Sequence, residues 1–150
     1  MRGLPRKWGR TPMNKALNYM ALARKAGRIE LGEEPVGAAA RAQHARLVVV
    51  ANDASDHTWR RAKSFVAGTQ QACIKVPFSK DELGMSIGRS SLAIAAFTDP
   101  ALALAFVKAL GSEQYMEVLE SLQKRTARVQ QRQAEERAHQ KNKRTGKSRK

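Results

Sequence analysis

Residues 45–55 read ARLVVVANDAS, and this stretch decides the fold. Leu47 to Ala51 is a continuous apolar run rich in valine, which is typical of a β-strand covered on both faces. Asn52 to Asp56 has the composition of a loop, and Ser55 is a good N-cap for a helix that continues through Trp59 to about Val66. The stretch therefore predicts a buried strand followed by a covering helix.

The same alternation extends in both directions from this strand. On its N-terminal side we expect a helix that begins at Thr11-Pro12 and ends at Gly27, a short strand over 29–31 and a helix over 33–43. On its C-terminal side we expect strands over 73–76 and 92–97, a helix from a capping box at 79–82 to Gly88, and a helix over 100–110. Strands alternating with helices predict an α/β fold, a three-layer α/β/α sandwich whose single four-stranded sheet is mostly parallel or mixed.

The ends of the chain have a different composition. Residues 1–10 form a basic arm, residues 11–111 hold the folded domain, and 112–136 are rich in helix formers. Tyr115, Met116, Leu119 and Leu122 recur at helical spacing, so we expect this extension to dock first and then project into solvent. Residues 137–150 contain almost nothing to bury and predict a disordered basic tail.

The net charge of +15 favours a polyanionic partner. The three regions 1–10, 11–110 and 111–150 carry +4, +5 and +6, so the ends are more basic per residue than the middle. Binding to an anionic membrane surface and a simple effect on solubility are alternative explanations of this charge. The C-terminal tail is interpreted either as an arm that binds phosphates or as a solubilising tail. The longest apolar stretch, Leu92 to Phe97, is too short to cross a bilayer, and the basic N-terminus lacks the apolar region of a secretory signal. The single cysteine, Cys73, fits a reducing compartment, so we expect a cytoplasmic protein that binds nucleic acid and no membrane.

Catalytic chemistry has little support in the sequence. The three histidines and Cys73 lack metal-ligand spacing, and we expect neither a metal nor a cofactor. Residues 53–57 contain the letters of a catalytic triad, but a turn-and-cap role is far more typical of such adjacent residues. Residues 84–90 only faintly suggest a phosphate loop and lie at the end of a helix. Sparse aromatic residues argue against a base-stacking sheet, and we expect Trp59 in the core and Trp8 on the N-terminal arm.

An ordered set of motifs over about residues 14–110 resembles the kink-turn RNA-binding ribosomal protein family, the L-seven-Ae/L-thirty-e superfamily, and especially its bacterial YlxQ-like branch. The motifs are ARKAGRI at 23–29, LGEE at 31–34, ARLVVVANDAS at 45–55, SKDELG at 79–84 with Ile87-Gly88, and FTDP at 97–100. The resemblance implies an α/β/α fold and an RNA face with two parts, the turn into the second helix and the loop after the fourth.

Residues are assigned to this RNA face by their positions in the motifs. The resemblance puts Gly32, Glu33 and Glu34 at the turn, Arg28 at a basic phosphate contact, and Gly88, Arg89 and Ser90 in the second loop. A helix N-terminus offers free N–H groups to the anionic backbone of RNA, and a glycine lets the chain come close where a side chain would clash. The chain has Glu34, Pro35 and Ala38 where archaeal members carry Asn, Glu and Lys. Basic arms can offset lost contacts, at the cost of sequence or shape specificity.

The most direct interpretation is a non-catalytic protein, monomeric when free, that binds structured RNA of ribosomal or other non-coding origin, or the ribosome itself. A protein-interaction adaptor on the same fold, docking through the 112–136 helix, is the alternative from another class. A third reading is the RNA-binding half of an RNA-modifying enzyme, for whose catalytic domain this chain has no length.

Overall fold

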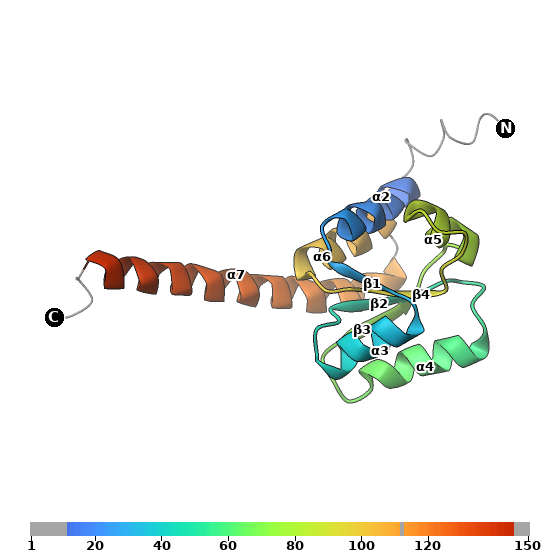
Figure 1. The fold of residues 1–150 in the computed structure, drawn as a ribbon, viewed down its shortest axis with the longest axis horizontal. Helices are drawn as coiled ribbons and strands as arrows, with labels where there is room; N and C mark the ends of the chain where they lie inside the picture. Colours follow the sequence, from blue (N-terminus) through green and yellow to red (C-terminus); the bar gives the residue numbers. More distant parts are fainter. Residues whose placement is uncertain (1–11, 112, 146–150) are drawn as a thin grey trace.

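A computed structural model of the protein describes residues 12–111 and 113–145, and its four strands form one sheet in the order β1-β4-β2-β3 (Figure 1). The strands are β1 Ile29–Leu31, β2 Leu47–Val50, β3 Ala72–Lys75 and β4 Ile94–Phe97. β4 lies between β1 and β2 and is antiparallel to both, whereas β2 and β3 are parallel. The sheet is therefore mixed, with a single parallel pair.

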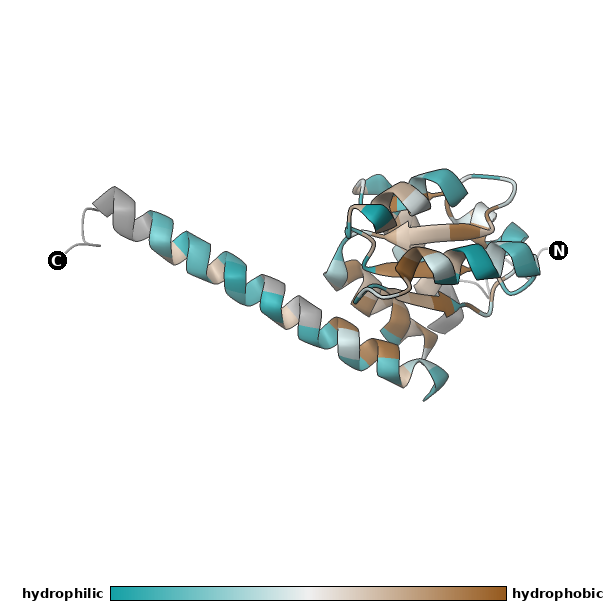
Figure 2. Ribbon diagram, turned by 90° about the horizontal axis from the view of Figure 1, so that it is seen from below, coloured by the Kyte–Doolittle hydropathy of each residue, from teal (hydrophilic) through white to brown (hydrophobic). Residues whose placement is uncertain are grey.

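Helices cover both faces of the sheet, which confirms the three-layer α/β/α sandwich. Alternate residues of β2 belong to different cores: Leu47 and Val49 pack on one face, Val48 and Val50 on the other. The first core includes side chains of α2 Pro12–Lys25, α5 Lys80–Ser86 and α6 Pro100–Leu110. The second includes side chains of α3 Glu33–Arg41 and α4 Asp56–Val66. Figure 2 shows the hydrophobic strands enclosed between helices whose outer faces are hydrophilic.

Side-chain caps fix where several helices begin, as the sequence predicts. Ser55 accepts a hydrogen bond from the Thr58 N–H at the start of α4, at 3.1 Å. Ser79 and Glu82 form the capping box of α5, and Asp53 also accepts a bond from the Lys80 N–H. Asp99 caps α6 ahead of Pro100. The triad-like letters at 53–57 therefore include two residues, Asp53 and Ser55, that act as helix caps.

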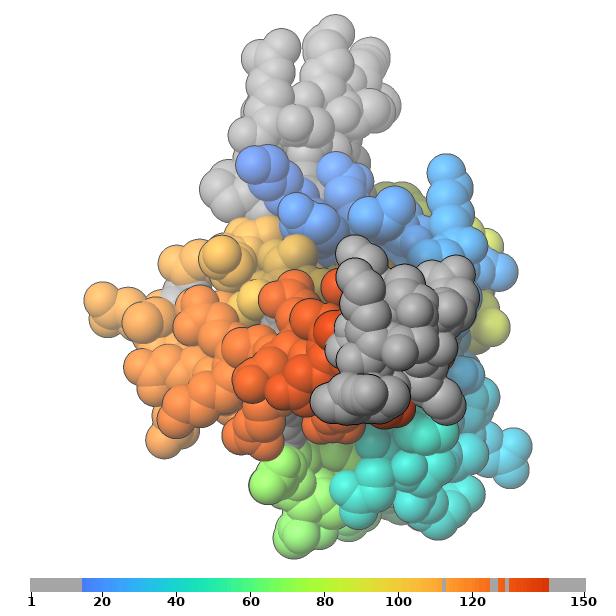
Figure 3. All heavy atoms as spheres, turned by 90° about the vertical axis from the view of Figure 1, so that its left-hand side faces the viewer, coloured from blue at the N-terminus to red at the C-terminus, as the bar shows by residue number. Residues whose placement is uncertain are grey.

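The C-terminal extension packs mainly against α6, on the side of the first core, and then projects away from the domain (Figures 1 and 3). It consists of the 3-10 turn η1 Glu113–Tyr115 and the helix α7 Met116–Thr145. Tyr115 and Leu122 are buried, and the Tyr115 hydroxyl donates to the carbonyl of Lys75 at 2.8 Å. Met116, expected in the same apolar stripe, is half exposed. In Figure 3 the projecting helix faces the viewer, with α2 on one side of it and α3 and α4 on the other.

α7 is longer than the sequence predicts. We expected the extension to end at 136 and the chain to be disordered from 137, whereas the helix continues to Thr145. The prediction is wrong for residues 137–145 because helix formation needs no burial there, and the stretch contains neither glycine nor proline. The expected arm at 1–10, with Trp8, and the last five residues of the tail lie outside the described residues.

Trp59 is half-buried at the margin of the second core, a more exposed place than the core position we expected. The ammonium groups of Lys63 and Lys75 lie 5.3 and 5.0 Å from the centroid of its ring.

Within residues 12–111 and 113–145, no helix combines the length and apolar character that a membrane span requires.

Candidate nucleic-acid interface

The turn that leads from β1 into α3 is built on Gly32. Its φ of +100° lies in a region that side chains with a Cβ rarely adopt, so the turn requires glycine. The Gly32 N–H donates to the carbonyl of Ile94 at 3.0 Å, and its carbonyl accepts from the Val36 N–H. No side chain caps α3, so the N–H groups of Glu33 and Glu34 have no partner inside the helix, and Pro35 has no N–H to offer. These donors are the physical basis for anion or RNA contact at this turn.

The second loop follows α5 and is held tightly against that helix. A Cβ on Gly84 would lie 2.6 Å from the Ser91 nitrogen and 2.9 Å from the Arg89 oxygen, so only glycine lets the loop approach. The Arg89 N–H donates to the Gly84 carbonyl at 2.8 Å. The Arg24 guanidinium of α2 donates to the carbonyl of Ile87, which fixes the beginning of the loop. Arg89 and Ser90 are exposed on this rigid base.

Strand pairing brings the turn and the second loop to the same end of the sheet. β1 and β4 are antiparallel, so the end of β1 lies beside the beginning of β4. Gly32 follows β1, and the loop at 88–93 leads into β4. The predicted residues at 32–34 and 88–90 are thus located at one end of the sheet, where the Gly32 N–H donates to Ile94 at the start of β4.

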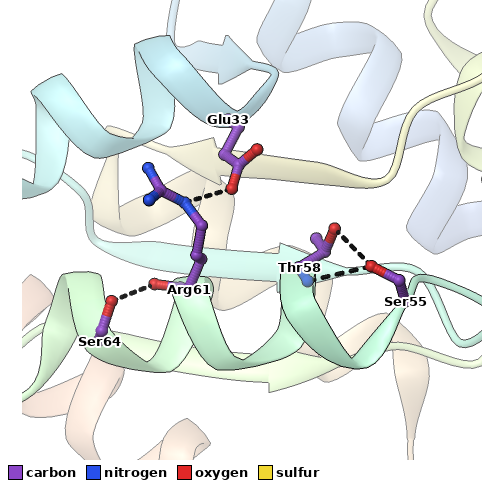
Figure 4. Close-up of polar contacts among 5 residues, drawn as sticks. All are labelled: Glu33, Ser55, Thr58, Arg61 and Ser64. Atoms are coloured by element: carbon purple, nitrogen blue, oxygen red, sulfur yellow. Dashed lines mark hydrogen bonds and ion pairs between the residues drawn. The ribbon is translucent and has the colours of Figure 1, made fainter.

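Glu33 and Glu34 have different surroundings within the turn. The Glu33 carboxylate forms an ion pair with Arg61 of α4 (Figure 4). The guanidinium of Arg61 also lies 5.2 Å from the centre of the Phe65 ring. Glu33 therefore links α3 to α4, a structural role that the sequence pattern did not indicate. Glu34 is exposed, and its carboxylate can accept hydrogen bonds from donors such as base amino groups.

Arg28 lies apart from the other predicted residues. It precedes β1, whereas Gly32 follows that strand, so the two residues are at opposite ends of the sheet. Its carbonyl accepts a hydrogen bond from the Thr98 N–H at 2.9 Å. Its side chain lines a surface pocket together with His44 and Arg46.

Sequence reasoning missed two residues that shape the interface, Arg24 and Gly84. A glycine inside a predicted helix is itself a signal of close backbone approach, and Gly84 could have been found this way. Arg24 gave no comparable signal, because its bond to Ile87 depends on how α2 packs against α5.

The described residues contain no cluster of three His, Cys, Asp or Glu side chains that could hold a metal ion. Burial raises the pKa of the Cys73 thiol to about 12, and the nearby Lys63 opposes this shift. Because a thiolate is the nucleophilic form of cysteine, Cys73 is poorly suited to act as a nucleophile at neutral pH. Burial likewise raises the pKa of Tyr115 above its ordinary value.

Two solved structures share the fold of this chain. A protein of unknown function from Bacillus halodurans C aligns with a TM-score of 0.61 and 23% identity, over 65% of this chain and 98% of that one. The 15.5kD RNA binding protein of Giardia lamblia aligns with a TM-score of 0.56 and 19% identity, over 72% of this chain and 87% of that one. At these identities the likeness concerns the fold alone.

Sequence comparison gives the family. No protein-family model matches the chain. The RNA-binding protein YlxQ of Enterococcus faecium is 37% identical over 75 residues, which are 50% of this chain and 72% of that protein. The chain therefore belongs to the family of the RNA-binding protein YlxQ, which confirms the YlxQ-like resemblance of its motifs.

Proposed function

We propose that this protein binds structured RNA of the kink-turn type and performs no catalysis on it. In this proposal the Gly32 turn and the loop at 88–90 recognise the shape of the RNA, and the basic C-terminal segment adds contacts to phosphates. In this proposal the RNA is ribosomal or another non-coding RNA, and the protein binds it in the cytoplasm, as a monomer when free.

One observation carries this proposal: the uncapped start of α3 lies at the same end of the sheet as the exposed, glycine-anchored loop after α5. Free N–H groups and exposed Arg89 can contact phosphates, whereas Glu34 can accept hydrogen bonds from base amino groups. The RNA-binding relative supports RNA as the class of partner.

The experiment compares binding to a kinked RNA and to a straight duplex of equal length across a series of salt concentrations. We expect tighter binding to the kinked RNA at every salt concentration, because shape contacts are less screened than phosphate contacts. Replacing Gly32 by Ala should reduce this preference, since the turn then needs a strained backbone. Equal binding of the two RNAs by the unchanged protein would contradict the proposed shape recognition.

A second candidate function is that of a protein-interaction adaptor, favoured by the projection of α7 beyond the domain. A chain that lacks residues 125–150 distinguishes the two candidates. Loss of partner capture with unchanged RNA binding would favour the adaptor.

A further inference from the structure

A surface pocket of about 500 Å³ lies between α3 and the sheet, beside the β1 edge. The strands and their flanking residues contribute polar side chains to it, and α3 contributes small ones. Its lining comprises Arg28, Glu30, His44, Arg46 and Thr98 from the sheet side, and Pro35, Ala38, Ala39 and Ala42 from α3 and its end.

The strand register explains why two arginines meet here. Ile29, Phe97 and Leu47 are paired across β1, β4 and β2 and belong to the first core. The next row along the same strands consists of Arg28, Thr98 and Arg46, held by the backbone bonds Thr98 N–H to Arg28 and Arg46 N–H to Phe97. Because side chains alternate between faces, this row points to the α3 side. At a strand spacing of about 4.8 Å, the two arginine backbones are about 10 Å apart with the Thr98 side chain between them.

Arg46 provides the second observation that points to a ligand. Its Nε atom is buried and has no hydrogen-bond partner within the described part of the chain. A buried donor without a partner is costly, and guanidinium groups bind the oxygens of phosphate groups with particularly favourable geometry. Glu30 is the one carboxylate of the pocket lining, against the two arginines, so the pocket keeps a positive balance.

We propose that the row Arg28–Thr98–Arg46 binds a backbone phosphate of the same RNA that contacts the Gly32 turn. This inference rests on the proposed function and adds a second contact region to it. The pocket extends along α3 from Pro35, which directly follows Glu34, to Ala42. These eight residues span about 10 Å along the helix axis, so an RNA strand that leaves the turn along α3 passes over the pocket. The small side chains of α3 permit close approach, and the arginines of the sheet supply the charge that this face of α3 lacks.

The test measures binding of the full chain to kinked and straight RNA across salt for Arg46→Gln and Arg28→Gln. Each variant should weaken binding to both RNAs. A plot of the logarithm of the association constant against the logarithm of the salt concentration should become less steep by about one unit. Lys108→Gln is the matched control, because it removes the same charge from an exposed position on α6, in the opposite helical layer. Glu30→Gln should strengthen binding to both RNAs, since it removes the negative charge from the pocket.

Each outcome of this test has a distinct meaning. If Arg46→Gln and Arg28→Gln behave like Lys108→Gln, the pocket does not bind RNA phosphate and the proposal is overturned. It is also overturned if these variants lose binding of inorganic phosphate or uridine monophosphate but retain the full salt slope with RNA, which would identify a site for free phosphates. If Arg46→Gln fails to fold, the exposed Arg28 and Glu30 carry the test with opposite expected signs. If the unchanged protein shows no preference for kinked RNA, the proposed function is contradicted. The pocket is tested separately, by the change that the variants cause in the salt dependence of RNA binding.

Discussion

Gly84 is the residue on which the shape of the second loop depends most directly. Replacing it by alanine places a Cβ against the backbone of Ser91 and Arg89, neither of which can rotate away as a flexible side chain could. We expect Gly84→Ala to destabilise the domain by about 1–3 kcal/mol and to reduce the preference for kinked RNA, because the loop must move. Thermal unfolding and RNA binding measure the two effects.

Gly37→Ala is the matched control for this substitution. Gly37 also lies inside a helix, but its added Cβ would meet the ring of Phe65 at 3.1 Å, a side chain that can shift. We expect Gly37→Ala to keep the full preference for kinked RNA, because its Cβ displaces a side chain and leaves the backbone of the second loop in place. If Gly84→Ala keeps the full preference for kinked RNA, the loop after α5 does not recognise the shape of the RNA.

At this scale the sequence predicts conformation better than it predicts contacts. Gly32 was assigned to the turn from the LGEE motif, and its φ of +100° in the structure shows a local backbone requirement for glycine at that position. Glu33 was assigned to the RNA face, although its carboxylate pairs with Arg61, a residue of another helix. Such a pairing depends on how α3 and α4 pack together, and spacing along the chain does not encode it.

Among the helices and strands too, local features were predictable from the sequence and long-range contacts were not. Helix starts at Ser55, Ser79 and Asp99 were predictable because each cap acts within about three residues of its own helix. The apolar runs of β2 and β4 likewise indicate strands that are buried on both faces. The strand order and the antiparallel position of β4 were not predicted, since short apolar strands do not specify their neighbours. Arg28 and Arg46 meet only as a result of that order.

α7 divides into a docked part and a projecting part with different effects on stability. Leu122 is fully buried in the first core, whereas the described side chains after it are exposed. We expect Leu122→Ala to lower the free energy of unfolding by about 2–5 kcal/mol, as is typical for a buried leucine. Deletion of residues 125–150 should leave the melting temperature of the domain nearly unchanged. A large loss of stability on this deletion would mean that the projecting part also supports the core.

Over the whole molecule, the segment with most of the net positive charge is distinct from the turn and the loop that recognise RNA shape in our proposal. Residues 125–150 carry ten Lys or Arg and two Glu, which is more than half of the net charge of +15. The turn and the loop that recognise shape in our proposal lie in the folded domain, where Glu33 and Glu34 partly offset the basic residues. Phosphate contacts from the extension add affinity that does not depend on the shape of the RNA.

This separation predicts how a chain without residues 125–150 binds RNA. Its affinity for kinked and straight RNA should fall by the same factor, and the slope of log K against log salt should decrease by several units, about one for each lost phosphate contact. The ratio of the two affinities should remain that of the full chain, because the turn and the loop are intact. At about 0.5 M salt the two chains should bind RNA with similar affinity, since exposed charges are then strongly screened. If the ratio instead falls to one on truncation, shape recognition depends on α7, and the RNA interface of the folded domain is incomplete without it.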